Sequence, residues 1–254
     1  YESADDVMDT APIHFPAHGL PYVELLCHVS PGVRPPVRLD PVGPTGAAAD
    51  VVVHPGPPLR ISARSLLHPV DAVGWRFEEP SRRHLRPDRL AAAGVHGPMI
   101  GRLERDGAVE VDGHRVTLHD VSEVQPGFRA AVLLDTSRCE AAIGLARDVD
   151  LLLCEATFLE QEADLAAAHG HLTAAQAGAI AAEAGAGLLV LTHFSDRYDD
   201  LDGHQREAAT VFPNVVCAHD LQVIPALRYR SAGAPFAPTS RPGAEAPERT
   251  GAVP

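Results

Sequence analysis

The chain has 254 residues, 45% of them hydrophobic and 22% charged, a composition that fits a folded globular protein and excludes a largely disordered one. Its formal net charge of −13 argues against general affinity for nucleic acid. A local basic surface is still compatible with it, because charges are screened over about 8 Å at physiological salt. No apolar run approaches the ~20 residues of a membrane-spanning helix. The four cysteines are far apart and form no CxxC pair, so we expect a reducing, cytoplasmic setting rather than a disulfide scaffold.

The first half of the chain carries weak signals. We interpret three apolar segments as strands of an antiparallel region, because Pro- and Gly-rich turns separate them. They are VELLCHV (23–29), DVVVH (50–54) and LRISARSLLH (59–68). The charged stretch from 78 to 105 has weak periodicity and predicts no clear element.

From residue 128 onward, apolar runs alternate with Ala-rich amphipathic stretches, the pattern of α/β layering. Thr173 and Gln176 predict a capping box at the start of a helix, and Gly185 and Gly187 predict its end. The other segments predict strands at 128–134, 151–154, 188–194 and 215–220 and helices at 140–149 and 202–212. Residues 231–254, rich in Pro, Ala and Gly, are expected to form a disordered tail after a single domain over 1–230.

Polar side chains follow the predicted strands, at the edge where open α/β sheets bind ligands. They are Asp135, Glu155, His193 and Asp220, with His171 on the loop before Thr173 and His68 at the end of segment 59–68. Imidazole nitrogen and carboxylate oxygen together suit a cation such as Zn²⁺. Two simpler interpretations of these residues are alternatives to a metal site. With 14 histidines in the chain most must be ordinary side chains, and Asp135 is equally a candidate helix N-cap.

The amino-acid sequences of these segments, and their order along the chain, resemble those of a known family. The runs LLDT, LLLCEATF, HGHLTAAQAGAIA and LVLTHFSDRY, preceded by SLLHPVDAVGWRFEE and GVHGPMIGRLERDGAVEVDG, are similar to the ribonuclease Z family of tRNA 3′-processing endonucleases. That family belongs to the metallo-β-lactamase superfamily, and the resemblance covers roughly residues 20–225. It implies an α/β fold, a metallo-β-lactamase-like αββα sandwich.

The resemblance also implies roles for individual residues. His68, Asp135 and His193 match metal ligands of a site that holds two zinc ions in the complete enzyme. His171 matches a catalytic histidine that acts on the scissile phosphate or the leaving group. Glu155 matches a glutamate that we expect to orient a ligand.

The sequence departs from the family at several points. The family's G-D-T, H-E-A-T and H-S-T stand here as L-D-T, C-E-A-T and H-L-T. The HxHxDH loop that supplies most metal ligands in the superfamily is absent from the printed residues. Together with a start at Tyr1, this suggests a fold incomplete at its N-terminus and a truncated chain that is inactive, since a two-metal phosphodiesterase needs a full set of ligands.

Residues 81–105 hold six arginines against Asp88 and Glu104 in an otherwise acidic chain. A solvated surface loop is the plain reading. The resemblance instead implies a protruding arm, about residues 78–106, that grips tRNA away from the active site. The residues expected to contact RNA are Arg82, Arg83, Arg86, Arg89, Gly97 and Pro98.

The leading hypothesis is therefore a cytoplasmic, homodimeric zinc endoribonuclease that removes 3′ trailers from precursor tRNA, with no DNA or membrane partner. One alternative is another metallo-β-lactamase-fold hydrolase of small phosphodiesters or sulfate esters, which has no use for a basic arm. A noncatalytic RNA-binding or dimer-partner subunit is the other alternative.

Overall fold

The computed structural model describes residues 11–28, 37–43, 51–55 and 59–224. The predicted tail at 231–254 lies outside these ranges. Within them, no helix is both long and apolar enough to cross a membrane.

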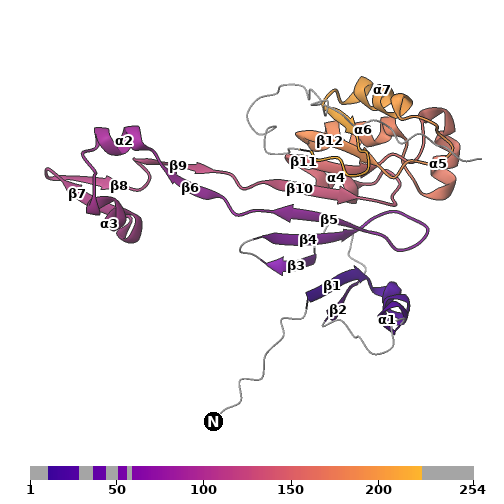
Figure 1. Cartoon of the computed structure of the whole chain (residues 1–254), viewed down its shortest axis with the longest axis horizontal. Helices are drawn as coiled ribbons and strands as arrows, with labels where there is room; N and C mark the ends of the chain where they lie inside the picture. Colours follow the sequence, from indigo (N-terminus) through magenta and orange to yellow (C-terminus); the bar gives the residue numbers. More distant parts are fainter. Residues whose placement is uncertain (1–10, 29–36, 44–50, 56–58, 225–254) are drawn as a thin grey trace, which may run out of the picture.

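Seven strands form the central sheet (Figure 1). They are β3 (Val51–Pro55), β4 (Arg60–Ser65), β5 (Val73–Glu78), β10 (Arg129–Leu133), β11 (Leu151–Glu155), β12 (Leu188–Thr192) and β13 (Val215–Cys217). Their spatial order is β13-β12-β11-β10-β5-β4-β3. Strands β10 to β13 are parallel, whereas β5 pairs antiparallel with both β10 and β4, and β4 with β3. The strands predicted after residue 128 and at 50–54 and 59–68 are thus confirmed.

Helices cover the parallel half of the sheet. They are α4 (Glu140–Ala146), α5 (Ala163–His169), α6 (Ala174–Ala184) and α7 (Asp202–Val211), with a short 3-10 turn η2 (Glu160–Glu162) before α5. Helix α4 packs on β10, α6 on β11 and β12, and α7 on α6 and β13. Small Ala side chains on the helices meet Leu residues of the strands in one buried core, so helix and sheet approach closely.

Helix α6 begins and ends where the sequence predicts. The Thr173 side chain accepts a hydrogen bond from the backbone N–H of Gln176, and the Gln176 side chain accepts one from the backbone N–H of Thr173. Gly185 ends the helix in the left-handed region, at φ 68°. The capping box matters for the site because it fixes the loop that carries His171.

The strand predicted at 23–29 is wrong. Residues Leu20–His28 form helix α1, which follows a 3-10 turn η1 (Ala17–Gly19). Leu25 and Leu26 are adjacent apolar residues, which breaks the alternation of a half-buried strand, and Leu and Glu favour helix. Strands β1 (Ala11–Pro16) and β2 (Val37–Val42) flank this helix and pair parallel, not antiparallel as expected for this region.

Residues 79–128 form a projecting unit that stands away from the sheet (Figure 1). Its base is an antiparallel ribbon of β6 (Arg82–Leu85) and β9 (Ser122–Gln125). Its tip holds helices α2 (Pro87–Ala92) and α3 (Pro98–Asp106) and a hairpin of β7 (Ala108–Val111) and β8 (His114–Thr117). The tip has its own core of Leu90, Val95, Leu103, Val109 and Val121.

The ribbon continues the antiparallel pair β5 and β10 through a short junction. The backbone N–H of Glu79 donates to the carbonyl of Phe128 at 2.8 Å. A Cβ on Gly127 would lie 1.8 Å from the carbonyl oxygen of Glu79, so only glycine fits there. The projecting unit is therefore an insertion between two paired strands.

Candidate active site

Three neighbouring parallel strands bring polar side chains to one edge of the sheet. Asp135 lies two residues beyond β10, Glu155 is the last residue of β11, and His193 directly follows β12. Asp135 and His193 both have left-handed backbones, at φ 52° and 59°. Such strain in residues other than glycine gathers at functional sites, where the surrounding structure holds it in place.

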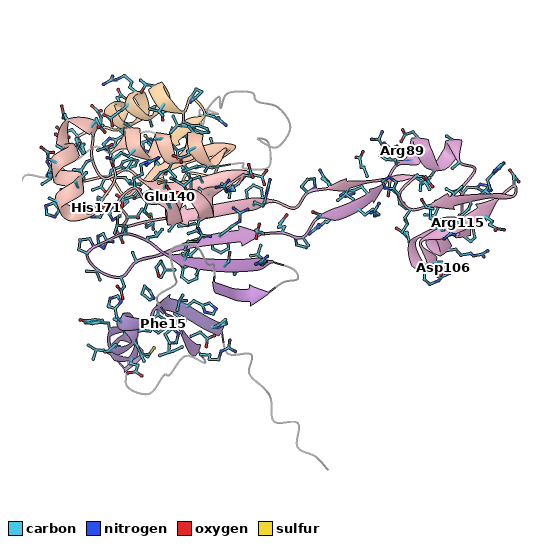
Figure 2. The ribbon with its side chains drawn as sticks, turned by 180° about the vertical axis from the view of Figure 1, so that it is seen from behind. Phe15, Arg89, Asp106, Arg115, Glu140 and His171 are labelled. Carbon is cyan, nitrogen blue, oxygen red and sulfur yellow. The ribbon has the colours of Figure 1, made fainter. Side chains whose placement is uncertain are left out.

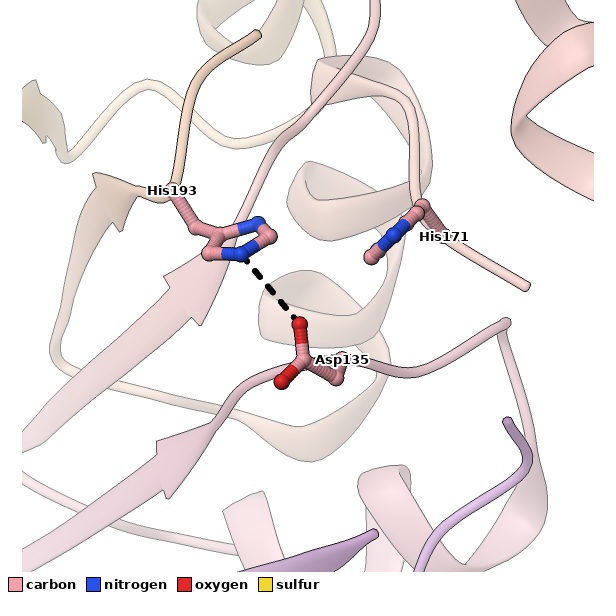
Figure 3. Close-up of side chains that lie close together, drawn as sticks. All are labelled: Asp135, His171 and His193. Carbon is pink, nitrogen blue, oxygen red and sulfur yellow. Dashed lines mark ion pairs between the residues drawn. The ribbon is translucent and has the colours of Figure 1, made fainter. Parts of the chain in front are cut away.

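Asp135, His171 and His193 point toward one another (Figure 3). Each offers one ligand atom, and these atoms all lie within 4.8 Å of one another. Asp135 Oδ1 is 3.2 Å from His193 Nε2, and the two imidazole centroids are 5.4 Å apart. The loop between α5 and α6 carries His171 into this group from outside the sheet.

Glu155 lies beneath the group, fully buried. Its Oε1 accepts from the backbone N–H of Thr136 at 2.6 Å, and its Oε2 from that of Leu172 at 3.1 Å. The Thr157 hydroxyl donates to Oε2 at 2.6 Å, and His171 Nδ1 lies 3.0 Å from Oε1. A carboxylate that receives four donors has the bonding pattern of the ionised, acceptor-only form.

This network assigns the proton positions of both histidines. Since Glu155 only accepts, His171 Nδ1 must carry a proton. The single hydroxyl proton of Thr157 goes to Glu155, so Thr157 Oγ1 accepts from His193 Nδ1, 2.9 Å away. In the neutral form, each ring therefore keeps its lone pair on Nε2.

The pair His193 and Asp135 could accept a cation between them. With the proton of neutral His193 on Nδ1, its Nε2 lone pair faces the Asp135 carboxylate at 3.2 Å, which places two acceptors against each other. A proton or a metal ion between them removes the repulsion. Two imidazoles and one carboxylate match the ligands that zinc prefers, so the residues fit such an ion.

His68 lies beside this group but outside it. Its Nδ1 is 3.0 Å from the carbonyl oxygen of Val70, and its ring centroid is 5.2 Å from that of His171. Gly170, at φ 79°, allows this approach, because a Cβ there would lie 2.3 Å from Pro69. The structure thus brings Asp135, His171 and His193 together, with His68 as a neighbour of His171.

The structure does not support two other interpretations of the sequence, Asp135 as a helix N-cap and Asp220 as a member of the site. Asp135 is not the N-cap of α4, because Cys139 occupies that position. Asp220 is exposed beyond β13 and is not part of the three-residue group. Thr157 and Thr136 are buried contacts of Glu155 and His193 that we did not predict, although Thr157 stands inside the E-A-T segment.

An aromatic cluster supports the segment after His193. His204 of α7 is fully buried between Phe194 and Tyr198, with ring centroids at 5.0 and 4.7 Å. Neither ring nitrogen of His204 has a hydrogen-bond partner within the usual distance and angle. Burial lowers the pKa of His204, against smaller opposing effects that include the charge of Glu162. Burial therefore disfavours the charged form of His204.

Comparisons with known proteins give the family. A family model described as a beta-lactamase superfamily domain matches residues 121–194, a range that includes Asp135, Glu155, His171 and His193. Ribonuclease Z of Nocardia farcinica is 45% identical over 226 residues, which cover 87% of this chain and 72% of the relative. Ribonuclease Z of Streptomyces avermitilis is 44% identical over 214 residues, 84% of this chain and 68% of the relative. The chain belongs to the ribonuclease Z family.

A solved structure agrees on the fold. Human tRNase Z, short form, matches with a TM-score of 0.56 at 18% identity, covering 86% of this chain and 67% of the human one. The ribonuclease Z relatives confirm the family resemblance, and the family model and the human structure support a metallo-β-lactamase-like α/β fold. As a ribonuclease Z homologue, the chain is a hydrolase of this superfamily.

In this ribonuclease Z homologue, the arginines expected to contact RNA lie on the projecting unit: Arg82 and Arg83 on β6 of the ribbon, Arg86 at the N-cap of α2, and Arg89 within α2. Arg89 lies far from His171 (Figure 2). Several of them are engaged within the unit. Arg86 forms two ion pairs, one with Glu123 at 2.9 Å. Arg83 and Arg89 donate to the side chain and the backbone carbonyl of Ser122, at 2.7 and 3.1 Å.

The other expected contacts lie at the surface of the same unit. Arg82 is exposed at the start of β6. Gly97 is the N-cap of α3 with φ 55°, and Pro98 is the first residue of that helix, where its fixed φ is favourable. Gly97 and Pro98 thus set the direction in which α3 starts within the tip.

Proposed function

We propose that this protein is a zinc-dependent endoribonuclease that removes 3′ trailers from precursor tRNA. The observation that carries the proposal is the convergence of Asp135, His171 and His193 on one point in a ribonuclease Z homologue, over the buried Glu155. The family name supports RNA as the substrate, and human tRNase Z shares the fold.

In this proposal Asp135 and His193 hold zinc, with His68 as a further ligand. The complete enzyme, meaning this chain joined to a segment that supplies the HxHxDH loop, holds two zinc ions. Zinc held by these residues would supply a Lewis acid for the phosphate and would lower the pKa of bound water. His171 is the catalytic acid. Glu155 stabilises its imidazolium form through Nδ1, so that Nε2 can deliver a proton to the departing ribose oxygen.

We further propose that the projecting unit is the tRNA-binding arm. Its two-stranded ribbon places α2, α3 and the β7–β8 hairpin far from His171, where they can hold the body of a tRNA while its 3′ end reaches the site (Figure 2). Contacts from arginine to phosphate give affinity without reading sequence, which suits an enzyme that accepts many tRNAs. A homodimer belongs to the same proposal, and analytical ultracentrifugation tests it.

The proposal is tested by binding and by cleavage. Fluorescence anisotropy should show that residues 1–254 bind a 3′-extended precursor tRNA more tightly than a DNA duplex of equal charge. The complete enzyme with zinc should release the intact trailer, identified by sequencing both product ends. Equal affinity for RNA and DNA, with turnover limited to small phosphodiesters, would favour a small-molecule hydrolase instead.

A further inference from the structure

The buried carboxylate of Glu155 reaches two histidines by different routes. It contacts His171 Nδ1 directly, at 3.0 Å. It reaches His193 only through the Thr157 hydroxyl, which donates to Glu155 at 2.6 Å and accepts from His193 Nδ1 at 2.9 Å. The Oγ1 atom of Thr157 thus links the Glu155 carboxylate to His193, one of the candidate metal ligands.

We propose that Thr157 is a positioning residue that couples Glu155 to His193, keeping the His193 proton on Nδ1 and presenting Nε2 to the cation. Second partners of this kind raise the basicity of a metal-binding imidazole and fix its orientation. The role assigned to the metal rests on the proposed function, whereas the proton position does not.

The backbone around Thr157 makes the bridge rigid. The carbonyl of Thr157 accepts from the N–H of Ser195 at 3.1 Å, and the N–H of Ala156 donates to the carbonyl of Thr192 at 2.9 Å. Residues on both sides of His193 are therefore tied to the segment that carries Thr157. Thr157 as a whole residue is 8% exposed, so water has little access to replace the hydroxyl.

A hydroxyl is required, and not merely a side chain of this size. Valine fills the same volume but neither donates to Glu155 nor accepts from His193. Loss of the hydroxyl leaves His193 Nδ1 without a partner, and the proton is then free to move to Nε2, the atom that must bind the metal. Serine keeps the hydroxyl and loses only a methyl group.

The decisive experiment is nitrogen NMR of histidine-labelled protein without metal, at a pH where histidines are neutral, with resonances assigned through His193→Gln and His171→Gln. In the unmodified chain, both His171 and His193 should carry the proton on Nδ1. Thr157→Val should move the His193 proton to Nε2 or cause exchange between the two nitrogens. His171 should not change, because its bond to Glu155 is direct. Thr157→Ser should keep the original pattern.

Zinc affinity, measured with Zn²⁺ alone against a chromophoric chelator, is the second readout. Thr157→Val should weaken it by 10- to 100-fold, the usual effect of losing such a partner, and Thr157→Ser should restore most of it. Thr136→Val is a matched control for the NMR experiment, because it removes another buried hydroxyl near the site that bonds no histidine.

The outcomes separate clearly. An unchanged His193 proton in Thr157→Val overturns the proposal, whatever the protein does with RNA. A change in His171 as well as His193 shows collapse around Glu155 and gives Thr157 a structural role only. If the His193 proton moves but zinc affinity is unaltered, the bridge exists and His193 is not the ligand, so the proposed function fails at that residue.

Discussion

Single residues decide which chemistry the sheet edge performs, and His193 and His171 are the pair most easily confused. Both lie in the group around Asp135, but His193 directly faces its carboxylate, and His171 directly contacts Glu155. In the complete enzyme, His193→Ala should therefore lose or displace zinc and abolish turnover of every substrate. His171→Ala should retain zinc and turn over precursor tRNA about 10²- to 10⁴-fold more slowly, the usual range for a lost general acid.

Metal analysis and two substrates separate the two roles. The slower rate of His171→Ala should recover partly with an activated aryl phosphodiester, whose leaving group needs no proton. Loss of zinc in His171→Ala would instead make His171 a ligand, as its place in the three-residue group allows. Equal loss of rate on both substrates would make it a group that positions substrate.

His204 should make the fold sensitive to mild acid. Its pKa is lowered by burial in the folded protein, whereas the unfolded chain has the ordinary value of 6.5. Below that value the unfolded state binds more protons than the folded state, so His204 favours folding above about pH 6.5 and this advantage is lost as the pH falls toward the folded pKa.

Urea unfolding between about pH 5 and 8 tests this effect. The free energy of unfolding should decline on the acid side, and His204→Leu should reduce that decline. The exposed His114, changed to Gln, serves as control and should leave the slope unaltered. An identical acid slope in His204→Leu would mean that other groups cause it.

At the scale of elements, local signals predict the structure where they are strong. The capping box of α6 is clear because it depends only on Thr173 and Gln176, which lie three residues apart. The apolar runs of β10 to β13 are clear because helices bury those strands, which therefore need little side-chain alternation. The sequence of α1 predicts a strand because its nine residues carry no clear helical stripe. In the structure, three of its apolar side chains are exposed: Tyr22, Leu25 and Leu26. The projecting unit gave weak periodicity because its short elements depend on a small local core.

The candidate site follows the same division. Asp135, Glu155, His171 and His193 were predicted from strand ends and from the resemblance, and the structure places them together, while their roles stay predictions. Thr157 could not be chosen in advance. Its function depends on which of its neighbours donates and which accepts, and that is visible only from three-dimensional contacts.

The cap of α6 should contribute measurably to stability. Thr173→Ala removes the hydroxyl that accepts from the N–H of Gln176 and donates to Glu160. We expect a loss of about 1 kcal/mol in the free energy of unfolding, within the ~0.5–2 kcal/mol usual for a lost N-cap. Thermal or urea unfolding measures it. The exposed Thr210, changed to Ala, should cost clearly less, and an equal cost would show that the cap is unimportant here.

At the scale of the whole molecule, changes in the projecting unit should affect tRNA binding and leave turnover of small substrates at the distant site unaffected. Replacing Arg82, Arg83, Arg86 and Arg89 by Ala should weaken tRNA binding and flatten its salt dependence by up to ~0.9 log unit per lost phosphate contact. Turnover of a small phosphodiester by the complete enzyme should hardly change. Since Arg86 also neutralises Glu123 within the unit, single variants of Arg82 and Arg86 should be compared, with circular dichroism as a check of folding.

Zinc content should be incomplete in residues 1–254. The printed sequence has no HxHxDH string, and within the described residues the proposal assigns three zinc ligands: His68, Asp135 and His193. Three donors hold one zinc weakly and leave no ligands for a second, so precursor tRNA should not be cleaved at a useful rate. Elemental analysis after dialysis measures the metal. Two tightly retained zinc ions per chain would contradict this expectation.

The left-handed backbones of Asp135 and His193 imply a trade-off between thermal stability and activity. Glycine adopts φ values of 52° and 59° without steric penalty, so Asp135→Gly and His193→Gly relieve strain that the buried sheet now holds in place. Each change also deletes a candidate ligand. Directed evolution that selects only for heat resistance is therefore expected to accept substitutions at these two positions. Such substitutions should stabilise the fold and abolish the activity.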